Sequence, residues 1–285
     1  MNFHEFTTQV ISEMRRRFPG YDIQVQEVPK LQDESYTGMA IHPSGGDIAL
    51  TMDLEALFDR FRNDLYLGNP MKAIEREIKE AVAQMPQFDT EALTNYERMK
   101  EKLTLQLVPA AKNKDLLADI PHRNIEDMAL AYRFDMGHNE RTSYSILVTN
   151  KMLNAYGISA AQLHDDALEA ASHSCPATLR NMNEVIRNIA GQTDPSPMWV
   201  ASIENGQNGA CVIQYPHFLD DAAETLGGSF YVLPSSIHEV LLLADDTSPS
   251  LSELENMVRT INQAEVAPEE RLSDNVFHYD CESHI

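Results

Sequence analysis

The hydrophobic positions of the chain are most concentrated in residues 227–246, where two apolar runs flank a short polar connection. The runs cover residues 229–233 and 238–244, and Pro234-Ser235-Ser236 joins them. Uninterrupted apolar runs bounded by turn-forming residues are typical of buried strands. Because side chains alternate along a strand, such a run needs cover on both faces of its sheet. The pattern predicts a central strand pair, with Leu241 and Leu243 on one face and Val240 and Leu242 on the other.

Amphipathic helices and one hairpin are expected in the first third of the chain. Apolar residues recur at helical spacing through residues 2–18, and Pro19-Gly20 ends that helix. Arg15-Arg16-Arg17 suits its last turn, where cations stabilise the helix dipole. Strands at about 22–28 and 37–42 follow. Three further helices are expected at about 52–66, 70–85 and 90–102, with Asp89 as the N-cap of the last.

Strands and helices are interspersed along the rest of the chain. The strands are expected at about 103–108, 127–135, 143–149, 198–203, 210–214 and 276–279. The helices are expected at about 150–156, 160–173, 178–190, 216–226 and 251–263. Ser159 with Gln162, and Ser250 with Glu253, have the spacing of capping boxes at the starts of two of these helices.

The order strand, polar loop, strand, helix begins three times, near residues 22, 127 and 198. Hairpins followed by covering helices predict an α+β fold, a mostly antiparallel sheet built from strand–loop–strand–helix units with helices packed on it. The charged segment 110–121 is the expected boundary between an N-terminal part, residues 1–109, and a C-terminal α+β domain, residues 110–285. One continuous domain is the alternative.

The composition excludes several classes of protein. Of the 285 residues, 43% are hydrophobic and 23% are charged, which is ordinary for a soluble globular protein. No segment approaches the roughly 18 consecutive apolar residues of a membrane span, and the N-terminus lacks the apolar core of a secretory signal. Cys175, Cys211 and Cys281 form no even-numbered disulfide framework. We therefore expect a reduced, cytoplasmic protein, with Cys211 in the core.

The formal net charge of −22 is unevenly placed along the chain. From Met198 onwards, fifteen acidic residues accompany only two basic ones, Arg259 and Arg271. Nucleic-acid affinity comes largely from Lys and Arg contacts with phosphate, so this surface predicts no binding to DNA or RNA. The simplest interpretation of the charge is solubility. Two alternatives are a surface that docks a basic protein partner and a decoy that imitates nucleic acid.

The short motifs of known catalytic and metal sites are incomplete in this sequence. His238-Glu239 begins a zinc-protease signature, but Leu242 stands where the second histidine is needed. Tyr231 stands where a nucleophile elbow requires glycine. The sequence contains no glycine-rich phosphate loop, and its cysteines and histidines have no established ligand spacing. We therefore expect no cofactor and no metal.

Polar residues next to the apolar strand pair are the candidates for a binding site. Ser235 and Ser236 also suit a simple turn, and Asn262 suits a helix end. His238 and Glu239 are expected on opposite faces of a strand. The candidate binding residues are Ser235, Ser236, His238, Glu239, Asn262, Glu269, Glu270 and Ser273. No catalytic residue is assigned.

The most distinctive sequence segment of the chain is Phe230–Val240. The other segments of this kind are Pro121-His122-Arg123, Leu153–Ser159, Met257-Val258-Arg259 with Asn262, Val266–Glu270 and Leu272-Ser273-Asp274. Together they resemble an uncharacterised family of bacterial proteins, a domain of unknown function common in Gram-positive gut bacteria. The N-terminal helix and hairpin fit as well, so the resemblance covers nearly the whole chain. It implies no substrate, cofactor or catalytic residue.

Three hypotheses about function stay open. Because no catalytic motif is complete and the C-terminal third is acidic, the leading one is a non-enzymatic cytoplasmic protein that binds or regulates another protein. The second is an enzyme with an undescribed site around Ser235, Ser236, His238 and Glu239, which requires these side chains to converge in a pocket. The third is an acidic decoy that imitates nucleic acid.

Overall fold

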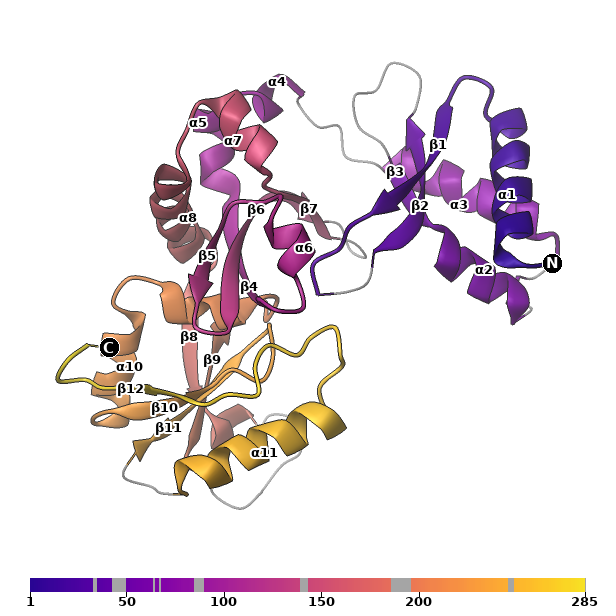
Figure 1. The fold of residues 1–285 in the computed structure, drawn as a ribbon. Helices are drawn as coiled ribbons and strands as arrows, with labels where there is room; N and C mark the ends of the chain where they lie inside the picture. The colour runs from indigo at the N-terminus through magenta and orange to yellow at the C-terminus, as the bar shows by residue number, and fades with distance from the viewer. Residues whose placement is uncertain are drawn as a thin grey trace. The chain divides into compact units, whose positions relative to one another are not determined.

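The computed structural model describes residues 1–32, 35–42, 50–63, 65–66, 68–84, 90–138, 143–185, 196–245 and 249–284. Contacts divide the chain into two compact units, Met1–Glu91 and Ala92–Ile285. The sheets are antiparallel and helices pack on them, so the predicted α+β class is confirmed (Figure 1). The division lies before the 110–121 segment that the sequence favours, because the strand Leu103–Pro109 pairs along its length with Met128–His138 in the second unit.

The first unit is a three-stranded sheet with helices packed on it. Its elements are α1 (Phe3–Arg17), β1 (Asp22–Val28), β2 (Tyr36–His42), β3 (Leu50–Asp53), α2 (Leu54–Arg62) and α3 (Pro70–Gln84), and the strand order is β1-β2-β3. The core gathers Phe6, Met14, Ile41, Leu54 and Ile74, all fully buried. The helix expected at 52–66 is shorter, because residues 50–53 pair with β2. Asp53 then caps α2 by accepting the N–H of Ala56 at 2.9 Å.

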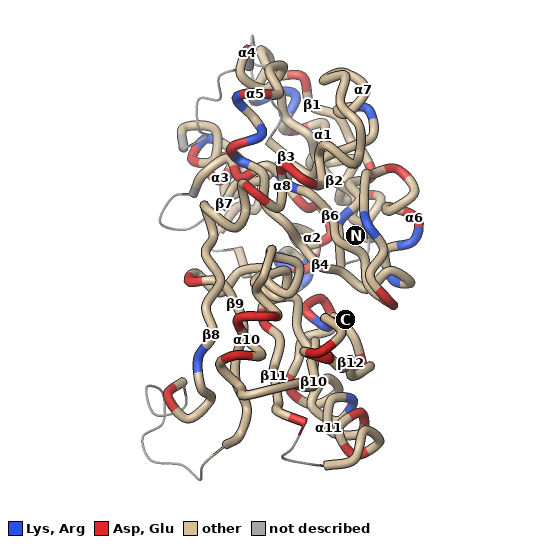
Figure 2. The backbone as a smooth tube through the Cα atoms, turned by 90° about the vertical axis from the view of Figure 1, so that its left-hand side faces the viewer, with Lys and Arg blue, Asp and Glu red and all other residues tan. Residues whose placement is uncertain are grey.

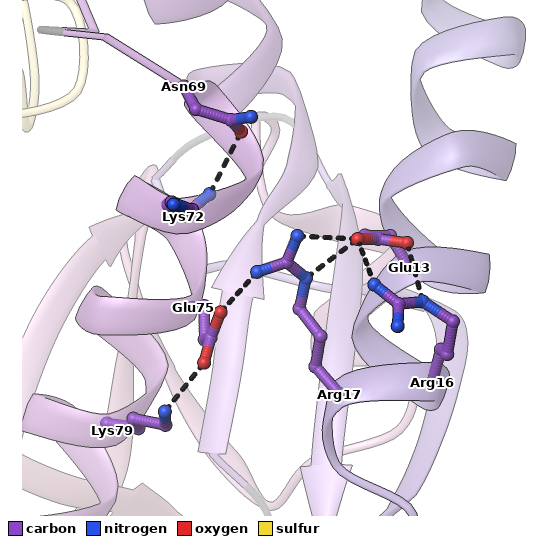
Figure 3. A network of polar contacts seen from close by, with 7 residues as sticks. All are labelled: Glu13, Arg16, Arg17, Asn69, Lys72, Glu75 and Lys79. Atoms are coloured by element: carbon purple, nitrogen blue, oxygen red, sulfur yellow. Dashed lines mark hydrogen bonds and ion pairs between the residues drawn. The ribbon is translucent and has the colours of Figure 1, made fainter.

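A network of charged side chains joins α1 to α3 (Figure 3). Arg17, in the last turn of α1, bonds Glu13 at 2.5 Å and also pairs with Glu75 of α3. Glu75 in turn accepts a hydrogen bond from Lys79 at 2.6 Å. Hydrogen bonds from Arg16 and Arg17 lower the pKa of Glu13 to about 2. Arg17 therefore links two helices in addition to meeting the dipole of its own helix.

The second unit begins with a four-stranded sheet. The short helix α4 (Thr90–Leu93) spans the division between the units. The elements that follow it are α5 (Tyr96–Met99), the short 3-10 helix η1 (Lys100–Lys102), β4 (Leu103–Pro109), α6 (Lys114–Leu117), β5 (His122–Ile125), β6 (Met128–His138), β7 (Ser143–Leu147), α7 (Asn150–Tyr156) and α8 (Ala160–Ser174). The central strand β6 pairs with β4, β5 and β7. Helix α8 packs against β4, and Ser159 caps it by accepting the N–H of Gln162 at 3.1 Å.

A five-stranded sheet completes the second unit. Its elements are β8 (Ala177–Asn181), β9 (Met198–Ile203), the 3-10 helix η2 (Gly209–Gln214), α10 (Phe218–Leu226), β10 (Phe230–Leu233), β11 (Val240–Ala244), α11 (Leu251–Ala264) and β12 (Phe277–Tyr279). The strand order is β12-β10-β11-β9-β8. The capping box that Ser250 and Glu253 predict at the start of α11 is confirmed. One large core contains buried residues from both sheets of this unit.

The predicted central strand pair is confirmed, since β11 is the middle strand of the five (Figure 1). Val240 and Leu242 are fully buried and belong to the large core. Leu243 belongs to a second cluster with Leu254 of α11, and Leu241 is partly buried against that cluster. The alternation expected along this strand therefore places its two faces against two different parts of the core.

Two segments differ from the structure that their local spacing predicts. The helix expected at 178–190 is wrong at its start, because residues 177–181 pair with β9 as the strand β8; residues 182–185 are helical, and residues 186–195 lie outside the described part. The strand expected at 210–214 is the 3-10 helix η2. The third strand–loop–strand–helix unit that the sequence predicts does not form, because strand pairing and burial override local preference.

The helix expected at 90–102 is also divided. Asn95 interrupts it, and its side chain accepts the N–H of Arg98 at 3.3 Å, so that the chain starts again as α5 and continues as η1. The expected cap Asp89 lies outside the described residues. The strand β5, which contains His122 and Arg123, was not predicted from the sequence pattern; it pairs with β6.

Candidate functional site

The predicted site residues lie where the β10–β11 connection meets residues 266–275, a segment that we call the strap. The N–H of Ile237 donates to the carbonyl of Glu270 at 2.8 Å, and the N–H of Leu272 donates to the carbonyl of Ser235 at 3.1 Å. Ser236 and Arg271 form an antiparallel bridge between the same two segments. The main chain therefore brings together sequence positions that are more than thirty residues apart.

Several predicted site residues take structural hydrogen bonds at this junction. The Oγ of Ser236 accepts the N–H of His238 at 3.0 Å. The hydroxyl of Ser273 donates to Asp127 at 2.7 Å, at the turn between β5 and β6. Asn262, 1% exposed in α11, donates to the carbonyl of Ser273 at 2.9 Å. The strap is thus tied to α11 and to the other sheet of this unit.

The structure does not gather every predicted residue. Glu239 and Glu269 are exposed, and β11 begins only at Val240. The expectation that His238 and Glu239 lie on opposite faces of a strand is therefore wrong, because both precede that strand. Ser235 is 9% exposed, and its carbonyl bonds the strap.

The imidazole of His238 connects the junction to a loop on its other side. Nδ1 accepts the main-chain N–H of Asn208 at 3.2 Å, and Nε2 lies 3.5 Å from the carboxylate of Glu270. Both ring nitrogens therefore face groups other than a serine hydroxyl. A serine–histidine pair of the kind that activates a nucleophile requires the hydroxyl at one of these nitrogens.

Residues 205–208, next to His238, form one wall of a partly enclosed cavity of about 120 Å³. The first sheet of the second unit supplies the opposite wall through β4, β6 and β7. The polar side chains that line the cavity are those of Thr104, Arg133, Asp135, Tyr144, Ser145, Asn205, Gln207, Asn208 and Tyr215. Asp135 is exposed and accepts the N–H of Gly137 at 2.8 Å.

Among the described residues that line this cavity, Arg133 carries the positive charge. Its guanidinium donates to the Oγ of Ser145 at 2.7 and 3.1 Å and to the amide oxygen of Gln106 at 3.4 Å. Within the described part of the chain, no carboxylate lies within ion-pair distance of it. Burial lowers the pKa of the guanidinium below its ordinary value. These neutral hydrogen-bond partners supply no countercharge to the partly buried guanidinium, and the carboxylate that lines the same cavity, that of Asp135, forms no ion pair with it.

Two cysteines also line the cavity. Cys211 is buried in η2, as expected, and burial raises the pKa of its thiol to about 12. This thiol is not activated as a nucleophile, since reactivity requires the thiolate. Cys175 is partly exposed, and Tyr215 donates to its carbonyl at 3.0 Å. Among the described residues, no group of three or more His, Cys, Asp and Glu side chains is placed to hold a metal ion.

Comparison with known proteins gives one match. The model of a single family, described as "Family of unknown function (DUF5688)", matches residues 3–281. The chain belongs to the DUF5688 family. No curated protein and no solved structure matches it. Membership of DUF5688 confirms the resemblance to an uncharacterised domain, and it assigns no activity. In the described part of this DUF5688 chain, no helix combines the length and the hydrophobicity that crossing a bilayer requires.

The cavity residues of this DUF5688 chain were missed by the sequence analysis. One signal was present, because Arg133 and Asp135 interrupt the otherwise apolar residues 128–136 of β6. The polar loop at residues 204–209 entered the sequence pattern only as the connection between the strands expected at 198–203 and 210–214. A charged residue inside a predicted strand costs free energy to bury without a partner, so it marks a candidate site residue.

Proposed function

We propose that the second unit binds a small oxyanion, of carboxylate or phosphate chemistry, in the cavity at Arg133. The observation that carries the proposal is a partly buried guanidinium whose hydrogen-bond partners among the described residues, Ser145 and Gln106, are neutral. Arginine presents a planar fork of donors that matches carboxylate and phosphate oxygens. A bound oxyanion would supply the countercharge.

The hydroxyl and amide side chains of the lining favour an oxyanion over an apolar ligand, whereas the carboxylate of Asp135, which lines the same cavity, does not. Thr104, Asn205, Gln207 and Asn208 bring hydroxyl and amide groups to the same space. Amide and hydroxyl donors can bond ligand oxygens that the guanidinium does not reach. The volume of about 120 Å³ suits a ligand of a few non-hydrogen atoms, well below the several hundred Å³ of pockets that enclose drug-sized ligands.

The test is calorimetric titration of the full chain with inorganic phosphate and with acetate, using neutral acetamide as the control ligand. Arg133→Met removes the charge and should weaken anion binding by roughly 10- to 100-fold, since hydrogen bonds to charged groups contribute about 1.5–3 kcal/mol. Arg133→Lys keeps the charge without the planar fork and should bind with intermediate affinity. Arg259→Met, on the exposed surface of α11, is the matched control.

Three outcomes would count against an oxyanion site. The first is that neither anion binds in a saturable way. The second is that Arg133→Met and Arg259→Met bind equally well, and the third is that acetamide binds as tightly as acetate. Any of these results would mean that the guanidinium of Arg133 does not hold an anion in this cavity.

We further propose that this anion site belongs to a non-enzymatic, cytoplasmic protein that binds or regulates a protein partner. The excess of acidic residues from Met198 onwards favours a partner with a basic surface. Helices α10 and α11 carry five of the fifteen acidic residues of this region, and acidic positions along both helices are marked in Figure 2. Rim charges act mainly on association rate and its salt dependence. Binding of a candidate partner should therefore slow steeply as ionic strength rises, and a rate that does not change with salt would exclude the acidic surface.

A further inference from the structure

We propose that His238 is the positioning residue of the Arg133 cavity, holding the wall at residues 205–208 through a single acceptor atom. The part of the inference that concerns ligand affinity rests on the proposed anion site. His238 does not line the cavity itself, so it would act through Asn208, which does.

The main chain fixes the imidazole before any ligand is present. The carbonyl of His238 accepts a hydrogen bond from the Oγ of Ser202, on β9, at 2.7 Å. Its N–H donates to the Oγ of Ser236 at 3.0 Å. These two bonds anchor residue 238 to β9 and to the turn that precedes it, and the ring meets the loop at Asn208.

The hydrogen bond of the ring defines its tautomer. A main-chain N–H can only donate, so Nδ1 of His238 must carry a lone pair where it meets Asn208 at 3.2 Å. The ring proton of the neutral imidazole is then on Nε2, which faces Glu270 of the strap at 3.5 Å. The atom of His238 that holds the loop is therefore Nδ1, which acts as a hydrogen-bond acceptor.

The loop needs such an anchor at this point. Asn208 adopts a left-handed conformation with φ 58°, which is uncommon for residues other than glycine and is tolerated best by asparagine and aspartate. Gly209 follows it and packs directly against Ser202 and the carbonyl of His238, and a Cβ at this position would clash with both. Without the Nδ1 acceptor, the N–H of Asn208 would lose its partner, and the wall would move away from Arg133.

Two substitutions distinguish the role of the Nδ1 acceptor from that of the rest of the His238 side chain. In His238→Asn, the amide oxygen can take the place of Nδ1, because it branches from the same carbon position. In His238→Gln, the amide reaches the place of Nε2 instead. His278→Gln is the matched control. His278 lies in β12, is similarly exposed and bonds Asp245, and neither residue lines the cavity.

The measurements are phosphate affinity by calorimetry and amide hydrogen exchange at Asn208, both on the full chain. We expect His238→Asn to bind within about threefold of the unsubstituted protein and His238→Gln about tenfold more weakly. Exchange at Asn208 should become faster in His238→Gln alone. His278→Gln should change neither quantity.

The two readouts separate failure of this inference from failure of the anion site. If the unsubstituted protein binds no anion, the proposed function fails, and the exchange comparison still decides whether His238 holds the loop. If His238→Asn and His238→Gln give the same exchange at Asn208, the positioning role is overturned. If exchange differs and affinity does not, the loop is held by His238 but does not set affinity.

Discussion

Arg123 donates a hydrogen bond of 2.6 Å from its guanidinium to Nε2 of His164, which is 9% exposed in the second unit. Because arginine can only donate, Nε2 must be an acceptor and the imidazole must be neutral. Nδ1 then carries the proton and donates to the hydroxyl of Tyr132 at 3.0 Å. Protonation of His164 would therefore place a second N–H against the guanidinium.

Stability should fall in acid because of this contact. Burial, and then the cation of Arg123, lower the pKa of His164 below its ordinary value. The unfolded chain then binds a proton at a higher pH than the folded chain does, so the contribution of His164 is present above pH of about 6.5 and is lost as the pH falls further. His164→Gln, which keeps an acceptor for Arg123, should remove up to about 1.4 kcal/mol per pH unit from the acid slope of the unfolding free energy.

Urea unfolding at several pH values measures this slope. The exposed His4→Gln, on α1, is the control and should leave the slope unchanged. Parallel pH curves for the unsubstituted protein and His164→Gln would show that His164 does not titrate between the folded and unfolded states in this range.

The middle strand of the five-stranded sheet makes a prediction about stability. Leu242 is fully buried, so Leu242→Ala should cost about 2–5 kcal/mol of unfolding free energy, the range for emptying a packed core site. Leu241 is only partly buried, and Leu241→Ala should cost clearly less. Ser236→Ala removes one hydrogen-bond acceptor and should cost at most about 1 kcal/mol. Equal losses for the two leucines in denaturant unfolding would contradict this order.

Two glycines of one loop should respond differently to the same change. In Gly209→Ala, the new methyl group would meet main-chain atoms of Ile203 and His238, which cannot move alone; we expect a loss of about 2 kcal/mol or more. At Gly206, φ is +70° and the space is open, so Gly206→Ala should cost about 1 kcal/mol, from conformation alone. Thermal unfolding of both variants tests the difference, and equal losses would mean that the packing at Gly209 relaxes.

The acidic surface predicts that the protein does not bind nucleic acid. Fifteen acids accompany two arginines from Met198 onwards, and the chain as a whole has a net charge of −22. Fluorescence anisotropy with labelled duplex and single-stranded oligonucleotides at low salt is the most permissive test. Saturable binding at micromolar concentration, weakened by added salt, would show that a cationic surface had been overlooked.

The features that the sequence determined are those that depend on neighbouring residues. Ser250 and Glu253 are three positions apart, so their capping box forms wherever the helix packs. The apolar run at 240–243 has no polar face, so burial on both sides was required, and β11 is the middle strand. The α+β class followed from the same local patterns.

Only the tertiary structure decided which segments with helical spacing would instead form paired strands. It also decided which polar side chains would lie close together. Residues 177–181 became a strand because β9 offered an open edge along their whole length, and no local pattern reports the presence of that edge. Arg133 and Ser145 lie on neighbouring strands of one sheet, whereas Asn208 follows a strand of the other sheet, so that their meeting at one cavity depends on how the two sheets pack. A residue pattern records the preference of each segment, whereas a cavity depends on the distance between segments, which folding alone sets.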